Sequence, residues 1–255
     1  MSPTLEQLKN HLDACLQPAR FQDYCPNGLQ VEGRERVQRL VTGVTASQAL
    51  IDSAIAWRAD AILVHHGYFW RGEAPQVVGM KRRRLAALLA AEISLFAYHL
   101  PLDAHPEFGN NARWGALMGI EPGAQQPLHQ DQPASVGNIG LLPQPLSAAA
   151  LVQDIARITG REPLHVGEPE ALVQRIAWCT GAAQGYIDAA IAAGADMYVT
   201  GEASEQTVHV AREEGLQFVA AGHHATERYG VQALGEHLAE RFALEHRFID
   251  IDNPV

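Results

Sequence analysis

Residues 51–60 read IDSAIAWRAD, and residues 187–196 read IDAAIAAGAD. The two segments share seven of ten residues at an offset of 136 positions. Each precedes a short apolar run, Ala61–Val64 or Met197–Thr200, with the length and composition of a buried strand. A repeated helix-then-strand unit predicts an α/β fold of two similar halves that arose by internal duplication. Chance similarity between two Ala-rich helices is the alternative.

The pattern continues on both sides of the repeated segments. Strands are expected at Leu40–Val44 and Ser94–Tyr98 in the first half, and at Val173–Cys179 and Gln217–Ala221 in the second, with helices between them. Such alternation is typical of mostly parallel sheets. We therefore expect strand ends from both halves to form one metal cleft, because open α/β sheets bind ligands at the carboxyl ends of their strands.

A region rich in Gln, Pro and Gly runs from about Glu121 to Pro145. It is the best candidate for the connection between the halves. A chain of 255 residues is long enough for two small domains. We expect the first half at residues 1–125 and the second at 126–255.

The charge balance excludes some classes of partner. Lys and Arg number 19 against 29 Asp and Glu, which gives a formal net charge of −10. An acidic chain is poorly suited to bind a phosphate backbone, which argues against a nucleic-acid partner. The one basic run, Lys81–Arg84, is typical of a solvated helix start. The most apolar long stretch, Ile176–Ala195, contains Asp188 and favours a buried helix over a membrane span.

The cysteines and the N-terminus point to a soluble cytoplasmic protein. Residues 1–6 have neither the basic region nor the apolar region of a signal peptide. Cys15, Cys25 and Cys179 are too few and too scattered for a disulfide framework. No two of them stand at CxxC spacing, which argues against a thiolate zinc site.

Twelve histidines are the unusual feature of the composition, and several of them follow expected strands. These strand-end residues are His65 and His66 before Gly67, His99 and Asp103, and His223, His224 and Glu227. Each cluster alone also has a structural explanation, since histidines fill cores and surfaces and a loop carboxylate can form a turn. Together, however, they gather imidazoles and carboxylates at one kind of position in the fold.

Five of these side chains are the expected metal ligands, and they are His65, His66, Asp103, His223 and Glu227. Three imidazoles and two carboxylates suit zinc, iron, manganese or nickel better than magnesium or calcium. Five ligands are too many for one catalytic zinc ion, which keeps three and a water. They suit two divalent ions per subunit, with a bridging carboxylate.

Three further residues are expected beside the metals, in proton transfer or in supporting the ligands. They are His99, His224 and Glu202. Glu202 is included because Thr200-Gly201-Glu202 stands where Val64-His65-His66 stands in the other repeat. A second correspondence aligns Ala97-Tyr98-His99 with Ala221-Gly222-His223 at an offset of 124.

The chain resembles the GTP cyclohydrolase type 2 homologue family, the dinuclear-metal-centre hexameric proteins related to the Ngg-one-interacting factor three. The motifs that carry the resemblance are Asn27–Val31, Val64–Gly67, Tyr98–Asp103 (YHLPLD), Thr200–Glu202 and Gly222–Glu227 (GHHATE). The resemblance implies two α/β halves per subunit and a metal pair facing the interior of a toroidal hexamer, a trimer of dimers. It assigns the metals to the same five ligands, and none of those positions is replaced here.

Two functions remain open. The first is a metal-dependent hydrolase acting on a small substrate, for which GTP cyclohydrolase-like ring opening, phosphoester hydrolysis and amide hydrolysis fit equally well. The second is a non-catalytic metal-binding ring that serves as a scaffold, a regulator or a metal-handling protein. The sequence contains no GxxxxGK[ST] loop and no GxGxxG loop to mark a nucleotide site.

Overall fold

The computed structural model describes residues 2–129 and 134–255 and divides the chain into two compact units. Unit 1 comprises Met1–Leu102 and Gly230–Asp252, and unit 2 comprises Asp103–Tyr229 and Asn253–Val255. This division differs from the expected boundary at residue 125. The chain crosses into unit 2 directly after the HLPL segment, and residues 230–252 return to unit 1 to add a helix and an edge strand.

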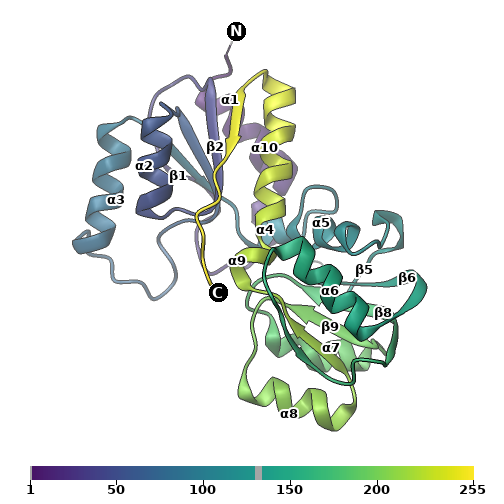
Figure 1. Ribbon diagram of the computed structural model, residues 1–255. Coiled ribbons are helices and arrows are strands. Elements are labelled where there is room, and N and C mark those ends of the chain that lie inside the picture. Colours follow the sequence, from purple (N-terminus) through teal and green to yellow (C-terminus); the bar gives the residue numbers. More distant parts are fainter. Residues whose placement is uncertain (1, 130–133) are drawn as a thin grey trace. The chain divides into compact units, whose positions relative to one another are not determined.

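Unit 1 is a five-stranded sheet covered by helices on both faces (Figure 1). Its strands are β1 (Gly28–Val31), β2 (Arg39–Thr45), β3 (Ala61–His66), β4 (Ser94–Ala97) and β11 (Glu245–Phe248), in the order β1-β4-β3-β2-β11. Its helices are α1 (Leu5–Leu16), α2 (Gln48–Ala56), α3 (Gly79–Ala90), most of α4 (Leu100–Asp103) and most of α10 (Arg228–Phe242). All strand pairings are parallel except β1 with β4, so the sheet is mostly parallel, as the alternation of strands and helices predicts.

Local sequence explains where the helices of unit 1 begin. Thr4 and Gln7 form a capping box at the start of α1, and Ser47 accepts a hydrogen bond from the Leu50 backbone at the start of α2. Leu50 and Leu88, from α2 and α3, pack against the buried strands in one apolar cluster. The core of unit 1 therefore lies between these helices and the sheet.

Unit 2 contains a six-stranded sheet in the order β5-β6-β8-β9-β10-β7. The strands are β5 (Gln126–Pro127), β6 (Asn138–Ser147), β7 (Leu164–Val166), β8 (Leu172–Cys179), β9 (Met197–Thr200) and β10 (Gln217–Ala220). The helices are α5 (Asn110–Leu117), α6 (Ala148–Thr159), α7 (Ile187–Ala192), α8 (Glu205–Glu214) and α9 (His223–Thr226). Short 3₁₀ turns occur at Pro18–Arg20 in unit 1, and at Pro122–Ala124 and Gln184–Tyr186 in unit 2.

The central strands of unit 2 are buried on both faces. Trp178 and Val199 pack into one apolar cluster with α5 and α6, whereas Tyr198 and Phe218 pack into a second cluster with α7 and α8. The sheet is mixed, not mostly parallel as the alternation of elements suggested. β6 belongs to the connection at residues 121–145 and does not follow a strand and a crossover helix. It is therefore free to pair antiparallel with β8. Residues 130–133 of that connection lie outside the described residues.

The two units repeat one topology. The order β1-β2-α2-β3-α3-β4 in unit 1 matches β7-β8-α7-β9-α8-β10 in unit 2, and in both the first strand is an antiparallel edge beside the last. Leu40 pairs with Ala61 as Ile176 pairs with Met197, which keeps the offset at 136. The repeat in the sequence is therefore a repeat of structure.

Strand pairing corrects one of the two expected correspondences. Val64 pairs with Ala97, and Thr200 pairs with Ala220. Glu202 thus stands at the position of His66, as the sequence predicts. The alignment of His99 with His223 at an offset of 124 is wrong by one residue. Strand pairing makes Gly222, not His223, the residue of unit 2 that is equivalent to His99.

One aspartate anchors each repeat in the same way. Asp60 Oδ2 accepts hydrogen bonds from the backbone N–H groups of Gln38 and Arg39, at 2.7 and 2.9 Å. Asp196 Oδ2 accepts from the backbone of Gln174 and Arg175, at 2.9 and 2.8 Å. The carboxylate that ends each repeated segment therefore holds the backbone at or near the start of the preceding strand.

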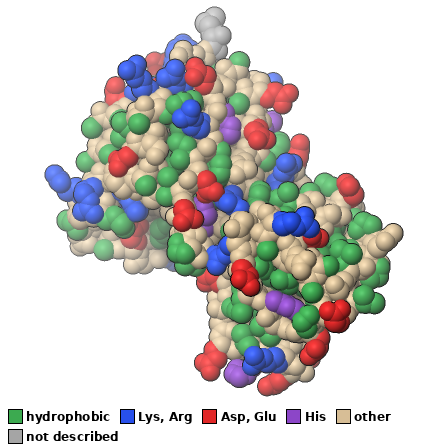
Figure 2. Space-filling model, viewed as in Figure 1, with side chains coloured by type: hydrophobic (Ala, Val, Ile, Leu, Met, Phe, Trp, Pro, Cys, Tyr) green, Lys and Arg blue, Asp and Glu red, His purple; other side chains and the backbone are tan. Residues whose placement is uncertain are grey.

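On the face shown in Figure 2, acidic and basic side chains are interspersed over both units. Among the described residues, no helix is both long enough and apolar enough to cross a membrane.

Asp60→Ala is expected to lower the free energy of unfolding of unit 1 by about 2–3 kcal/mol, because it leaves two strand-entry N–H groups unsatisfied. Urea unfolding followed by circular dichroism measures this loss. Asp52→Ala is the matched control, since Asp52 is exposed and, among the described residues, its side chain accepts one hydrogen bond, from Gln48 on its own helix. Equal stability of the two variants would contradict the anchoring role.

Candidate metal centre

Three histidines of unit 1 gather at the carboxyl ends of two parallel strands. His65 and His66 end β3, and His99 follows β4, which pairs in parallel with β3. Parallel strands finish at the same edge of a sheet, so these side chains lie together. One ring nitrogen from each residue falls within 4.8 Å of the others, an arrangement able to hold a metal ion.

Hydrogen bonds orient each of these imidazoles. His65 is fully buried, and its Nδ1 lies 3.0 Å from the Tyr98 carbonyl oxygen. A carbonyl can only accept, so Nδ1 donates and Nε2 carries the lone pair that a metal ion requires. His66 Nδ1 lies 3.2 Å from the Thr45 hydroxyl. This pattern of supported Nδ1 atoms is typical of metal-binding histidines.

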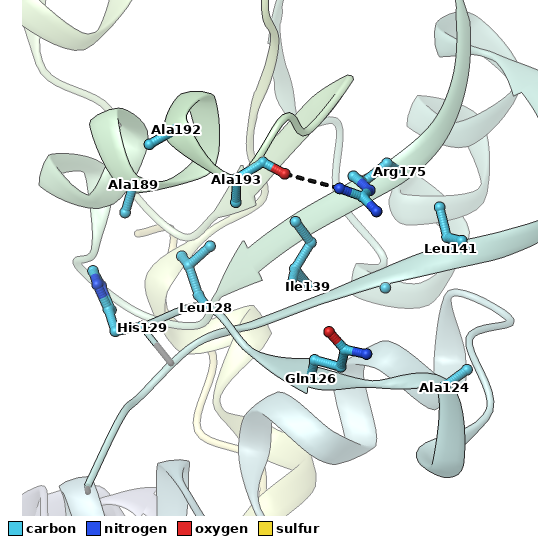
Figure 3. A pocket seen from close by; sticks show the side chains of 11 residues that line it. Ala124, Gln126, Leu128, His129, Ile139, Leu141, Arg175, Ala189, Ala192 and Ala193 are labelled. Atoms are coloured by element: carbon cyan, nitrogen blue, oxygen red, sulfur yellow. Dashed lines mark hydrogen bonds between the residues drawn. The ribbon is translucent and has the colours of Figure 1, made fainter. Parts of the chain in front are cut away.

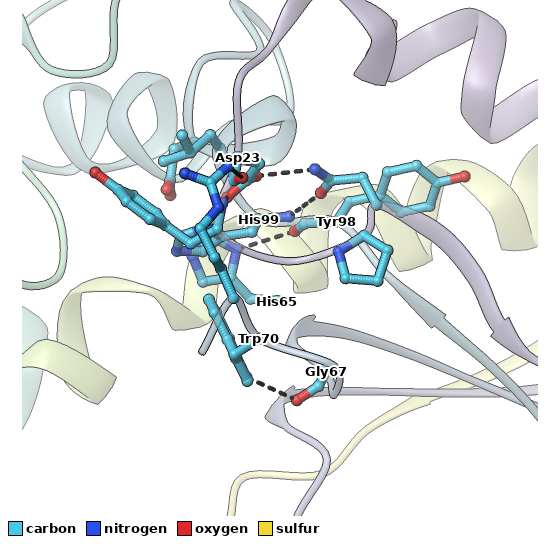
Figure 4. A network of polar contacts seen from close by, with 12 residues as sticks. Asp23, His65, Gly67, Trp70, Tyr98 and His99 are labelled. Carbon is cyan, nitrogen blue, oxygen red and sulfur yellow. Dashed lines mark hydrogen bonds and ion pairs between the residues drawn. The ribbon is translucent and has the colours of Figure 1, made fainter. Parts of the chain in front are cut away.

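Asp23 holds His99 from a distant loop (Figure 4). His99 Nδ1 donates to Asp23 Oδ1 at 2.7 Å, while Asp23 Oδ2 accepts from the Leu100 backbone and from Asn27. Burial alone would raise the pKa of Asp23, but the hydrogen bond and charge of His99, with smaller contributions from Asn27 and Tyr24, lower it to about 2. The loop therefore presents an ionised carboxylate to His99.

The sequence did not indicate Asp23. It lies in a turn-rich loop 76 residues from His99, and neither periodicity nor spacing links the two. Asp23, Cys25 and His99 also form a group able to hold a metal. Burial and the Asp23 charge raise the pKa of Cys25 to about 12, which keeps the thiol protonated and makes the imidazoles the better donors.

His223 of unit 2 lies between two carboxylates. Its Nδ1 lies 2.7 Å from Glu202 Oε1, and its Nε2 lies 3.1 Å from Glu227 Oε2. Burial would lower the pKa of His223, but Glu227 and Glu202 together raise it to about 9. His223 and Glu227 stand four residues apart, so the predicted pairing along this segment is present.

Asp103 and Glu227 bring two carboxylates together inside unit 2. Their side chains are 6% and 2% exposed, and one oxygen of each lies within 4.8 Å of the other. Asn110 donates to Asp103 Oδ1 at 2.8 Å. A side chain at Gly181 would collide with Glu227, because its Cβ would lie 2.1 Å from Oε1. Two buried carboxylates this close repel each other, and a bound cation offsets that repulsion.

The remaining predicted residues also lie in unit 2. Glu202 contacts His223, as described, and so orients the ring of a predicted ligand. His224 is buried, and its backbone N–H donates to the Val255 carbonyl oxygen at 3.0 Å. The structure thus assembles His65, His66 and His99 in unit 1, and Asp103, His223, Glu202 and Glu227 in unit 2.

A pocket of unit 2 is separate from these residues (Figure 3). It has a volume of about 750 Å³ and lies between α7 and the β5–β6 edge. Ala189, Leu141 and Ile139 line it, and Arg175 donates from its rim to the Ala193 carbonyl. None of the predicted metal ligands lines this pocket, so its size does not make it the candidate site.

Comparison with known proteins decides the family. The family model described as Duf34/NIF3 (NGG1p interacting factor 3) matches residues 3–254. The chain belongs to the NIF3 family. A protein of Pseudomonas aeruginosa named GTP cyclohydrolase 1 type 2 homolog is 59% identical over the full length of both chains. An Escherichia coli K12 protein of the same name is 54% identical over 98% of each chain.

Solved structures of NIF3 relatives share the fold. The protein ybgI, described as of unknown function, is 51% identical, with a TM-score of 0.93 over 99% of this chain and all of that one. The protein TTHA1606 of Thermus thermophilus is 34% identical, with a TM-score of 0.89 over 99% of this chain and all of that one. The resemblance inferred from the motifs is therefore confirmed.

Asp23→Asn is expected to release the ring of His99. Loss of the ionised acceptor weakens the hydrogen bond to Nδ1, so the downfield proton resonance of that bond disappears from spectra of ¹⁵N-histidine-labelled protein. His99→Gln assigns the resonance. The exposed Asp252→Asn is the control, and an unchanged His99 signal in Asp23→Asn would contradict the pairing.

Proposed function

We propose that this NIF3 protein binds two divalent metal ions per subunit and uses them to hydrolyse a small substrate. The ligands are His65, His66, Asp103, His223 and Glu227. The observation that carries the proposal is the buried pair of carboxylates, Asp103 and Glu227, whose oxygens lie within 4.8 Å of each other. Such a pair is costly without a cation and is the usual bridge or anchor of a metal pair.

The donor set fits borderline metals. Imidazoles with fixed Nδ1 atoms and buried carboxylates suit zinc, iron, manganese or nickel. His65 is held by the Tyr98 carbonyl and His223 by Glu202, so both rings are oriented before any ion binds. When bound, such ions act as Lewis acids and lower the pKa of water.

The residues beside the ligands supply proton transfer and support. Asp23 fixes the ring of His99 next to His65 and His66, where it can pass a proton to or from a reacting group. Glu202 orients His223, and buried His224 supports the same short helix. Trp70 packs edge-on against His99, with the ring centroids 5.1 Å apart.

The substrate is a small molecule, and GTP cyclohydrolase-like ring opening is the first reaction to test, because relatives more than 50% identical carry that name. The proposal also includes a cytoplasmic hexamer, a trimer of dimers, with no membrane or nucleic-acid partner. The alternative is a non-catalytic metal-binding ring that acts as a scaffold, a regulator or a metal-handling protein. The same donor set would serve it.

Metal content tests the centre. Purified wild-type protein is expected to hold about two ions per subunit by elemental mass spectrometry, and His65→Ala and Glu227→Ala should each lose most of that metal. His209→Ala is the matched control, because His209 is largely exposed on α8. Wild-type protein without metal, even after incubation with zinc, manganese or iron, would overturn the proposed centre.

Turnover separates the two functions. Metal-loaded wild type is expected to consume GTP or a phosphoester in a chromatographic assay, and His99→Gln should lower kcat by roughly 10²-fold while retaining its metal. Protein that holds two ions but turns over neither GTP, phosphoesters nor amides would favour the non-catalytic ring. The control His209→Ala should match wild type.

A further inference from the structure

A second pocket of unit 2 opens at the carboxyl ends of the parallel strands β9 and β10. It has a volume of about 640 Å³, and Gly201 and Glu202, which follow β9, and Gly222, which follows β10, line it beside Arg161. Pockets at the carboxyl ends of parallel strands are the usual ligand sites of α/β sheets. The volume suits a small organic molecule.

Arg161 is the cation of this pocket. Among the described residues it makes no ion pair, and its Nη1 atom is shielded from solvent without a hydrogen-bond acceptor. Two carboxylates line the same pocket. Glu202 is engaged with His223 at 2.7 Å, and Glu162 is exposed; neither forms an ion pair with Arg161 among the described residues. A guanidinium that lines a pocket and has no ion-pair partner among the described residues is suited to an oxyanion from outside the chain.

Gly222 makes room for the guanidinium. A Cβ built on Gly222 would lie 2.5 Å from Arg161 Nη1, so any side chain there would displace the arginine. The φ angle of Gly222 is 101°, which also favours glycine. The Arg161 backbone is fixed in turn, since its carbonyl accepts from the Thr159 hydroxyl at 3.2 Å.

The internal repeat shows which residue of unit 1 is equivalent to Gly222. Strand register places Gly222 where His99 stands, and Leu164 where Gly28 stands. In unit 1 the loop before the edge strand holds the imidazole of His99 with the anionic Asp23. In unit 2 the same loop presents a cation, and the position of the imidazole has no side chain.

We propose that this pocket binds the phosphate or carboxylate group of a small organic anion through Arg161. The oxyanion accepts hydrogen bonds from the guanidinium, and the apolar Leu164 and Ala203 face the rest of the molecule. The inference does not depend on hydrolysis or on bound metal, because every group that it uses belongs to unit 2 and is present without an ion.

Calorimetric titration at low salt tests the site, with inorganic phosphate and acetate as probes. Wild type is expected to bind at least one of them, and Arg161→Ala to weaken that binding by roughly ten- to a hundredfold. Arg161→Lys should recover only part of it, since an ammonium lacks the planar fork. The preferred probe identifies the group as phosphate or carboxylate.

Arg157→Ala is the matched control, because Arg157 is an exposed arginine on α6 paired with Asp154. It should bind like wild type. Each titration is repeated after metal removal by a chelator, and thermal unfolding checks that every variant is folded. Failure of both probes to bind, equal binding by folded Arg161→Ala, or binding that disappears with the metal would overturn the proposal. Metal content is a separate readout, so the two proposals can fail independently.

Discussion

Parallel pairing of neighbouring strands is the constraint on which the candidate chemistry depends. Because β3 runs parallel to β4, their carboxyl ends meet at one edge of the sheet. His65, His66 and His99 therefore converge, although His66 and His99 lie 33 positions apart in the sequence. The same pairing of β9 with β10 places Glu202 against His223. Antiparallel pairing would send these ends to opposite sides of each sheet.

The strand ends of unit 1 and those of unit 2 carry different kinds of charged group. The edge of unit 1 holds imidazoles that are supported by a carbonyl, a hydroxyl and one ionised aspartate. Unit 2 instead buries Asp103 and Glu227 close together, with His223 as a partner of the latter. Buried carboxylates need compensating charge. Unit 2 therefore has the stronger need for a cation, and unit 1 supplies imidazole rings that are oriented by hydrogen bonds.

The sequence predicted the features that a local pattern of residues determines. Apolar runs located the central strands to within a few residues, and polar residues after those strands identified the candidate ligands. It could not predict Asp23, because the loop that carries it reaches His99 only through the folded antiparallel edge strand β1. It also did not predict the antiparallel pairing of β6 with β8, since that pairing leaves no periodic signal. The register error at His99 arose because the spacing of alanine, histidine and an acidic residue recurs at an offset of 124, whereas strand pairing sets the equivalence one residue away.

The internal repeat explains how two units with the same strand topology carry different side chains at their strand ends. The anchoring aspartates, Asp60 and Asp196, kept the same backbone contacts in both copies, so the strand ends kept their geometry. The loop before the edge strand differs between the copies, and it carries Asp23 in one and Arg161 in the other. An anionic loop side chain requires a donor such as the His99 ring, whereas a cationic one requires an acceptor. Glycine at position 222 supplies no side chain, which leaves the role of acceptor to a ligand.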